Sequence, residues 1–136
     1  MTAEPNGEPV ILIVEDNARN LKLVRDVLNH VGYRTLEAAT AEDGLALARE
    51  ERPGLVLMDI QLPGMDGVEA LARLRSDPAT AGVRVLALTA FAMKDDKERF
   101  LAAGFDGYLE KPLDVRRLPE QVAAALAADA REEGVA

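Results

Sequence analysis

The amino-acid sequence predicts an α/β fold in which five parallel strands form an open, doubly wound sheet covered by helices on both faces. Short runs rich in β-branched and leucine side chains alternate along the chain with longer segments of helical periodicity. Runs such as Val-Ile-Leu-Ile-Val are apolar throughout, which is typical of strands buried on both faces. Strict alternation of strands and helices favours parallel strands joined by right-handed crossovers. A chain of 136 residues has the length of one such domain.

The elements can be assigned in chain order. The strands are expected at Val10–Val14, Tyr33–Ala38, Leu55–Met58, Arg84–Leu88 and Tyr108–Leu109. The helices are expected at Ala18–Val31, from Thr40 to just before Pro53, from Val68 to near Asp77, at Lys94–Ala103, and from Leu118 to about Leu126. Gly32 is suited to end the first helix, and the Thr40 hydroxyl can cap the second by accepting from the amide of Asp43. The fourth helix has only Phe100 and Leu101 as large apolar side chains, so we expect it to be the least firmly packed.

Composition limits the domain and its partners. Residues 1–9 and 129–136 are polar or small, so we expect disordered tails around one folded domain over residues 10–128. The absence of cysteine excludes disulfides, thiolate metal sites and cysteine nucleophiles, and it favours a cytoplasmic protein. A net charge of −8 repels nucleic acid and anionic lipid, and no apolar run is long enough to span a membrane. We therefore expect neither nucleic acid nor a membrane as a partner.

Polar side chains follow four of the five predicted strands. Glu15 and Asp16 come after the first strand, Asp59 after the third, Thr89 after the fourth and Lys111 after the fifth. Each has an ordinary explanation when taken alone, such as a helix cap or a solvated surface charge. Because the carboxyl ends of parallel strands meet at one edge of a sheet, where such folds bind ligands, we expect these residues to form a site.

The residue types of this site favour a divalent cation and phosphoryl transfer. Clustered carboxylates raise one another's pKa unless a cation compensates, and oxygen ligands without histidine or cysteine favour Mg²⁺ or Mn²⁺. Three carboxylates and Lys111 sum to −2, which one divalent ion neutralises. Asp59 is the natural nucleophile because a carboxylate needs no base at neutral pH, and Lys111 and the Thr89 hydroxyl can compensate the charge of an acyl phosphate.

Four motifs, in this order, resemble the receiver domain of two-component response regulators. They are Val-Glu-Asp-Asn at 14–17, Leu-Met-Asp-Ile-Gln-Leu-Pro-Gly-Met-Asp-Gly at 57–67, Leu-Thr-Ala-Phe-Ala-Met-Lys at 88–94 and Gly-Tyr-Leu-Glu-Lys-Pro at 107–112. The resemblance spans about residues 10–128 and is strongest to single-domain regulators of the DivK type and to receivers of hybrid kinases. It implies a flavodoxin-like (βα)5 fold with strand order 2-1-3-4-5.

The resemblance also implies roles for the acidic residues. Asp59 would accept the phosphoryl group from a kinase histidine. Glu15, Asp16 and Asp59 would hold Mg²⁺ together with the backbone carbonyl of Gln61. Glu15 stands where the family more commonly has aspartate, and its extra methylene leaves open whether it reaches the metal directly or through water.

Further implied roles concern the phosphoryl group and its signal. Lys111 would contact the phosphoryl group, and the Lys111-Pro112 bond would be cis. Thr89 and Tyr108 match the switch pair of the family, in which the hydroxyl moves toward the phosphoryl group and the aromatic ring turns inward. The fourth helix, fifth strand and fifth helix would form the signalling face. We expect Phe91 to shield the acyl phosphate from water and so slow self-hydrolysis.

The expected partners are a histidine kinase, a histidine phosphotransfer protein, and a downstream protein effector or kinase. Arg19, Asn20 and Leu23 are expected to help select the kinase, and the single histidine, His30, is expected to lie on the surface. We expect a monomer, with a phosphorylation-dependent dimer as the alternative. The chain is not expected to be an enzyme beyond its own phosphoryl transfer and slow dephosphorylation.

Three other functions were weighed against this interpretation. A phosphatase of the haloacid dehalogenase type needs an acid two residues after its nucleophile, where this chain has Gln61. Such a phosphatase also needs a cap insertion to shape a substrate pocket, and the sequence contains no such insertion. A flavodoxin-like cofactor binder needs a phosphate-binding loop after the first strand, where Glu15 and Asp16 would repel phosphate. The third is a receiver that binds partners without phosphorylation, against which the intact Asp59 and Lys111 argue.

Overall fold

The computed structural model describes residues 9–90 and 94–135, which form five strands and five helices in strict alternation. The strands are β1 (Val10–Val14), β2 (Arg34–Ala38), β3 (Leu55–Asp59), β4 (Arg84–Thr89) and β5 (Gly107–Glu110). The helices are α1 (Ala18–His30), α2 (Ala41–Glu51), α3 (Gly67–Ser76), α4 (Lys94–Ala103) and α5 (Leu118–Val135).

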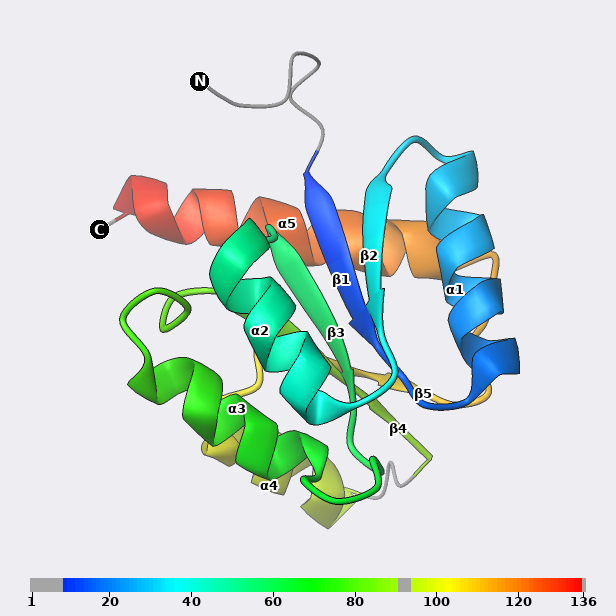
Figure 1. The fold of residues 1–136 in the computed structure, drawn as a ribbon. Coiled ribbons are helices and arrows are strands. Elements are labelled where there is room, and N and C mark those ends of the chain that lie inside the picture. Colours follow the sequence, from blue (N-terminus) through cyan, green and yellow to red (C-terminus); the bar gives the residue numbers. More distant parts are fainter. Residues whose placement is uncertain (1–8, 91–93, 136) are drawn as a thin grey trace.

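The strands form one parallel sheet in the order β2-β1-β3-β4-β5, which confirms the predicted fold class and strand order. Helices α1 and α5 cover one face of the sheet, and α2, α3 and α4 cover the other (Figure 1). Val14 pairs with Met58, Asp59 with Leu88, and Thr89 with Glu110, so neighbouring strands end close to one another. The loops that leave these strand ends therefore share the lower edge of the sheet in Figure 1.

Alternation along the strands divides the core into two layers. The residues that face α2, α3 and α4 are Leu12, Val14, Val56, Met58, Val85 and Ala87, and those that face α1 and α5 are Ile11, Ile13, Leu55, Leu57, Leu86 and Leu88. Every residue of β3 is buried, as its continuous apolar run predicts. Because successive side chains point to opposite faces, the position of a polar residue along its strand decides which helix layer it approaches.

Side-chain caps fix where three of the helices begin. Asn17, Thr40 and Asp66 each accept a hydrogen bond from the backbone amide three residues later, at 2.9–3.1 Å. The Thr40 bond comes from Asp43, as predicted. Gly32 follows α1 with φ of 105°, a left-handed conformation that glycine adopts without strain. The caps at Asn17 and Asp66 lie in the loops that leave β1 and β3.

The structure differs from the sequence prediction mainly at the ends of elements. Strands β3 and β4 each extend one residue further than hydropathy suggests, to Asp59 and Thr89. Helix α5 continues to Val135, so most of the segment 129–136, expected to be a disordered tail, is helical. The alanine-rich run from Ala123 to Ala130 leads into this segment and favours continuation of the helix, since alanine has the highest helix propensity. Residues 1–8 of the expected N-terminal tail lie outside the described residues.

The prediction that α4 is weakly packed is confirmed. Phe100 is the only buried side chain among residues 95–103, and the Leu101 side chain is half exposed. Phe100 meets Phe105 edge to face, with ring centroids 6.1 Å apart. Across the described residues, no helix combines the length and the hydropathy needed to cross a membrane.

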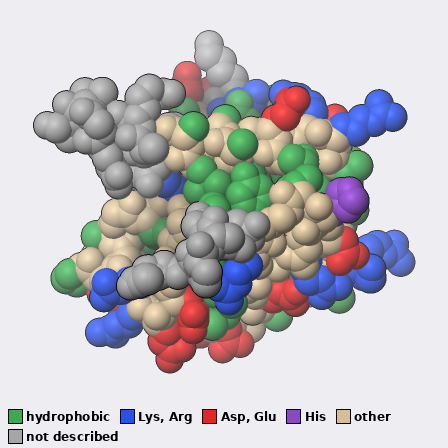
Figure 2. All heavy atoms as spheres, turned by 90° about the horizontal axis from the view of Figure 1, so that it is seen from above, with side chains coloured by type: hydrophobic (Ala, Val, Ile, Leu, Met, Phe, Trp, Pro, Cys, Tyr) green, Lys and Arg blue, Asp and Glu red, His purple; other side chains and the backbone are tan. Residues whose placement is uncertain are grey.

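The amino ends of the strands, opposite the acidic residues, carry a second polar network. The Arg75 guanidinium at the end of α3 donates to the carbonyl oxygens of Val83 and Gly104 at 2.6 and 3.1 Å and lies 3.1 Å from Asp106 Oδ2. Asp106 also pairs with Arg84 at 2.9 Å and accepts from the Val85 amide at 2.8 Å. Figure 2 views this end of the molecule, where hydrophobic side chains gather centrally and charged side chains lie around them.

Candidate functional site

Backbone pairing continues beyond the strands and positions the site residues. The Glu15 amide donates to Ala38 O at 3.0 Å, and the Lys111 amide donates to Thr89 O at 2.8 Å. Asp59 is the last residue of β3. The backbone amide of the next residue, Ile60, donates a hydrogen bond to Leu88 O at 3.0 Å. These bonds extend the parallel ladder and hold the predicted site residues at one edge of the sheet.

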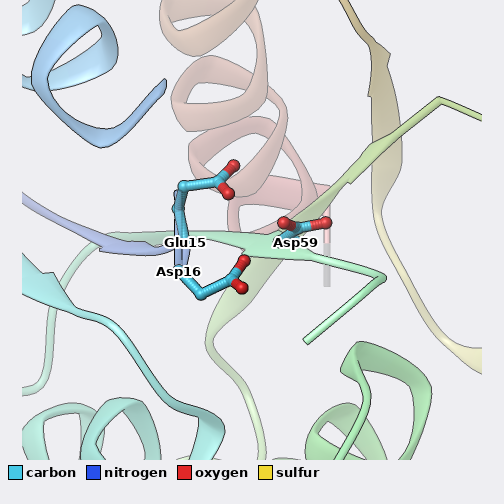
Figure 3. Close-up of side chains that lie close together, drawn as sticks. All are labelled: Glu15, Asp16 and Asp59. Atoms are coloured by element: carbon cyan, nitrogen blue, oxygen red, sulfur yellow. The ribbon is translucent and has the colours of Figure 1, made fainter. Parts of the chain in front are cut away.

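Three carboxylates converge at this edge. Glu15, Asp16 and Asp59 each place a carboxylate oxygen within 4.8 Å of the others. Figure 3 shows the three carboxyl groups around a common space, two of them from the end of β1 and the third from β3. Glu15 and Asp59 are buried, whereas Asp16 is exposed. The sequence prediction that these residues meet is confirmed.

Lys111 provides the positive charge of the site. Its Nζ lies 3.0 Å from Asp59 Oδ2 and 3.2 Å from Glu15 Oε1. Asp59 Oδ1 accepts a hydrogen bond from the Gln61 amide at 2.9 Å, so both oxygens of this carboxylate are held. The Lys111-Pro112 bond is cis, as the resemblance implied. Burial acts to lower the pKa of Lys111, but the hydrogen bond to Asp59 and the charges of Asp59 and Glu15 raise it overall.

Glu15 is the least satisfied member of the group. Its Oε2 accepts from the Asn17 amide at 3.1 Å, but Oε1 is fully buried and makes no well-directed hydrogen bond within the described residues. Lys111 is close enough to Oε1 for an ion pair only. Burial, followed by the adjacent Asp59 carboxyl, raises the pKa of Glu15. An unsatisfied buried oxygen beside two further carboxylates is an arrangement that a divalent cation fits.

Gly67 is a residue of the site that sequence reasoning did not single out. A Cβ atom at this position would lie 2.5 Å from the backbone oxygen of Asp59 and 2.9 Å from Ile60 Cα. The Gly67 amide donates to Ile60 O at 3.0 Å, so α3 begins directly against the end of β3. The only signal for Gly67 in the sequence is its place at the end of the motif 57–67.

By strand alternation, Thr89 and Tyr108 belong to the side of the sheet that α4 covers. Asp59 follows Leu55 and Leu57 on the α1 and α5 side, whereas Thr89 follows Val85 and Ala87 on the other. Thr89 is buried, and Tyr108 is half-buried against the same cluster as Phe100. Phe91, the predicted shield of the acyl phosphate, lies outside the described residues.

The residues expected to select a kinase are adjacent on α1. Arg19, Asn20 and Leu23 line an open cavity of about 310 Å³ together with Lys22 and Asp26. His30, at the end of the same helix, is exposed, as predicted. This surface begins one turn beyond Asp16 and is therefore next to the acidic group.

Residues 11–123 match the family model of the response regulator receiver domain. The chain belongs to this family. Among curated relatives, the polar-differentiation response regulator DivK of Brucella anthropi is 44% identical over 116 residues, which cover 85% of this chain and 94% of that protein. DivK of Brucella ovis is 43% identical over the same share of each chain.

Solved receiver domains have the same architecture. A CheY-like receiver domain protein from Methanospirillum hungatei has a TM-score of 0.83 and 33% identity, covering 93% of this chain and 99% of that one. The receiver domain of a sensor histidine kinase from Pseudomonas aeruginosa has a TM-score of 0.81 and 32% identity, covering 89% and 99%. That structure holds a magnesium ion coordinated in its active site cleft. The acidic group of this chain thus has the composition of a receiver active site.

Proposed function

We propose that this receiver domain accepts a phosphoryl group on Asp59 from the phosphohistidine of a histidine kinase or a histidine phosphotransfer protein. The observation that carries the proposal is the fixed Asp59 carboxylate, with Gln61 N–H on Oδ1 and Lys111 on Oδ2. A carboxylate oxygen attacks phosphorus, the nitrogen–phosphorus bond breaks, and the imidazole leaves with its electron pair and takes up a proton. The product is an aspartyl phosphate whose added charge Lys111 partly offsets.

A divalent cation completes the charge balance of the site. Glu15, Asp16 and Asp59 would hold Mg²⁺, or Mn²⁺ in its place, together with the backbone carbonyl of Gln61. Such an ion supplies positive charge to the equatorial phosphoryl oxygens during transfer. The orphan Oε1 atom of Glu15 and the proximity of the three carboxylates support this assignment.

The phosphoryl group would change protein–protein affinity through Thr89 and Tyr108. Both residues lie on the side of α4, so a movement of the Thr89 hydroxyl toward Asp59 would alter the packing between α4 and β5. We propose protein partners for this face, such as a downstream effector or kinase, and a kinase or phosphotransfer protein for the α1 surface around Arg19, Asn20 and Leu23. The cytoplasmic location predicted from the cysteine-free composition is part of this proposal.

We propose that the chain acts only on its own phosphoryl group and does not turn over an external substrate. Gln61 occupies the position in which a phosphatase of the haloacid dehalogenase type needs a general acid. Its side chain is exposed, and its contribution to Asp59 is a backbone amide. These two facts support a phosphoacceptor with slow self-dephosphorylation over a phosphatase.

The proposal is tested by intact-protein mass spectrometry after incubation with acetyl phosphate and Mg²⁺. The expected result is a gain of one phosphoryl group, reversed by hydroxylamine because an acyl phosphate is an activated carboxyl derivative. The gain should disappear in Asp59→Asn and in the presence of a chelator. Asp26→Asn, which removes an exposed carboxylate of α1, is the matched control and should retain the gain. Phosphorylation that survives Asp59→Asn would overturn the assignment.

A further inference from the structure

Few side chains of helix α4 pack toward β5, and one of them is the charged side chain of Lys97. Phe100 is its only buried side chain among residues 95–103. One turn earlier, the ammonium group of Lys97 lies 5.2 Å from the centroid of the Tyr108 ring. This distance is within the range of a cation–π contact. Lys97 and Phe100 therefore both connect α4 to the region around Tyr108.

Lys97 also lies in a field of nearby electron-rich groups. The Tyr108 hydroxyl and then the negative charge of Glu110 on the same strand raise the pKa of Lys97. Lys97 and Tyr108 are both half-buried, so the contact is partly shielded from water. Tyr108 is thus held by the ammonium group of Lys97 and by the apolar cluster that contains Phe100.

We infer that Lys97 is a latch that holds Tyr108 in the half-buried position it has in this structure, on the α4 side of β5. This inference rests on the proposed function, in which Tyr108 turns inward after phosphorylation. Inward rotation carries the ring and hydroxyl away from Lys97, so the latch must break before the phosphorylated conformation forms. Lys97 is then a positioning residue that sets how readily phosphorylation shifts the population of conformers.

The chain offers a matched control for this role on the same helix. The Arg99 guanidinium lies 5.6 Å from the centroid of the Phe100 ring, two residues after Lys97. Arg99→Met and Lys97→Met therefore remove the same charge and the same kind of aromatic contact, but only Lys97→Met affects Tyr108. Lys97→Arg keeps both the charge and the ability to lie over a ring, so it should restore the latch.

The experiment uses ¹⁹F NMR of the whole chain labelled with 3-fluorotyrosine. The chain has two tyrosines, Tyr33 and Tyr108, and Tyr33 packs against the α1 and α5 cluster, so it serves as an internal reference. Without ligand, the Tyr108 resonance should shift in Lys97→Met and stay in place in Lys97→Arg and Arg99→Met. Beryllofluoride with Mg²⁺, a phosphoryl analogue, is then titrated into each protein.

By linkage, breaking the latch in advance should tighten binding of the analogue. Half-saturation should occur at a concentration about two- to five-fold lower in Lys97→Met, the effect of one partly exposed cation–π contact. An unchanged or higher half-saturation in Lys97→Met, or an equal decrease in Arg99→Met, would overturn the latch while leaving the proposed function intact. Wild-type protein that binds no beryllofluoride would instead overturn the proposed function, and the latch with it.

Discussion

Glu15 shows how much the energetics of the site depend on a single residue. The sequence places an acid after β1, and its extra methylene relative to aspartate allows contact with a metal either directly or through water. In the structure Glu15 is more deeply buried than Asp16, and it pairs with Lys111. Burial of a side chain that follows the end of a strand depends on tertiary packing, which hydropathy does not report.

We predict that Glu15→Gln stabilises the metal-free protein at neutral pH. Burial raises the pKa of Glu15 in the folded chain above its ordinary value of 4.5, so folding disfavours the ionised form. The wild type therefore loses stability as pH rises above that value, whereas the glutamine variant does not. Urea unfolding in a chelator should show a gain of about 1 kcal/mol in Glu15→Gln at neutral pH that shrinks as pH falls toward 4.5.

The opposite sign would show that the ion pair with Lys111 outweighs the cost of burying the charge. Glu37→Gln is a suitable control because Glu37 is a partly exposed carboxylate in an ion pair with Arg25. A pair of this kind contributes about 0–1 kcal/mol, so its loss should not increase the free energy of unfolding.

At the scale of elements, the start of α3 is positioned by the absence of a side chain. We predict that Gly67→Ala destabilises the fold by about 1–3 kcal/mol, because the new Cβ meets backbone atoms of Asp59 and Ile60 that cannot move independently. Helix propensity alone favours alanine, so a loss of stability identifies the clash. Gly82→Ala is the control, since nothing lies within 4 Å of its Cβ position. Urea unfolding measures both, and equal effects would contradict the clash.

The other end of α3 is held by Arg75, which sequence reasoning did not identify. We predict that Arg75→Met costs about 2 kcal/mol, because the partly buried carbonyl oxygens of Val83 and Gly104 lose a charged donor. Hydrogen exchange should quicken at the Asp106 amide, which donates to Val85 O. Arg73→Met is the control on the same helix, since Arg73 makes only an exposed pair with Glu69. Similar effects of the two substitutions would contradict the role of Arg75.

The elements also show which features of the fold can be predicted from the sequence. All five strands and five helices of the described residues lie where periodicity and apolar runs placed them. The strand ends at Asp59 and Thr89 were missed because hydropathy falls there while backbone pairing continues. The Arg75 network was missed because its acceptors are mostly backbone carbonyls, which carry no sequence signal.

At the scale of the whole molecule, the proposed phosphoacceptor and the proposed switch residues belong to opposite sides of the sheet. Asp59 continues the side of β3 that faces α1 and α5, while Thr89 and Tyr108 lie toward α4. In the proposed function, a signal from Asp59 would pass from β3 through β4 to reach Tyr108 on β5, the strand that pairs with β4 at the edge of the sheet. This arrangement follows from strand order and side-chain alternation, which explains why the meeting of Glu15, Asp16, Asp59 and Lys111 at one edge could be predicted from the sequence.

The net charge of −8 makes the stability of the whole molecule sensitive to cations in two separable ways. We predict that NaCl stabilises the protein modestly, because salt screens repulsion among its carboxylates. MgCl₂ at matched ionic strength should stabilise it further, by about 1–3 kcal/mol at concentrations well above the dissociation constant, because the ion binds only the folded acidic group. Urea unfolding measures both increments. Asp16→Asn should abolish the second increment and keep the first, since Asp16 is exposed and its loss leaves the core intact. An Mg²⁺ increment that survives Asp16→Asn would mean that general screening, and not the site at the end of β1, accounts for the effect.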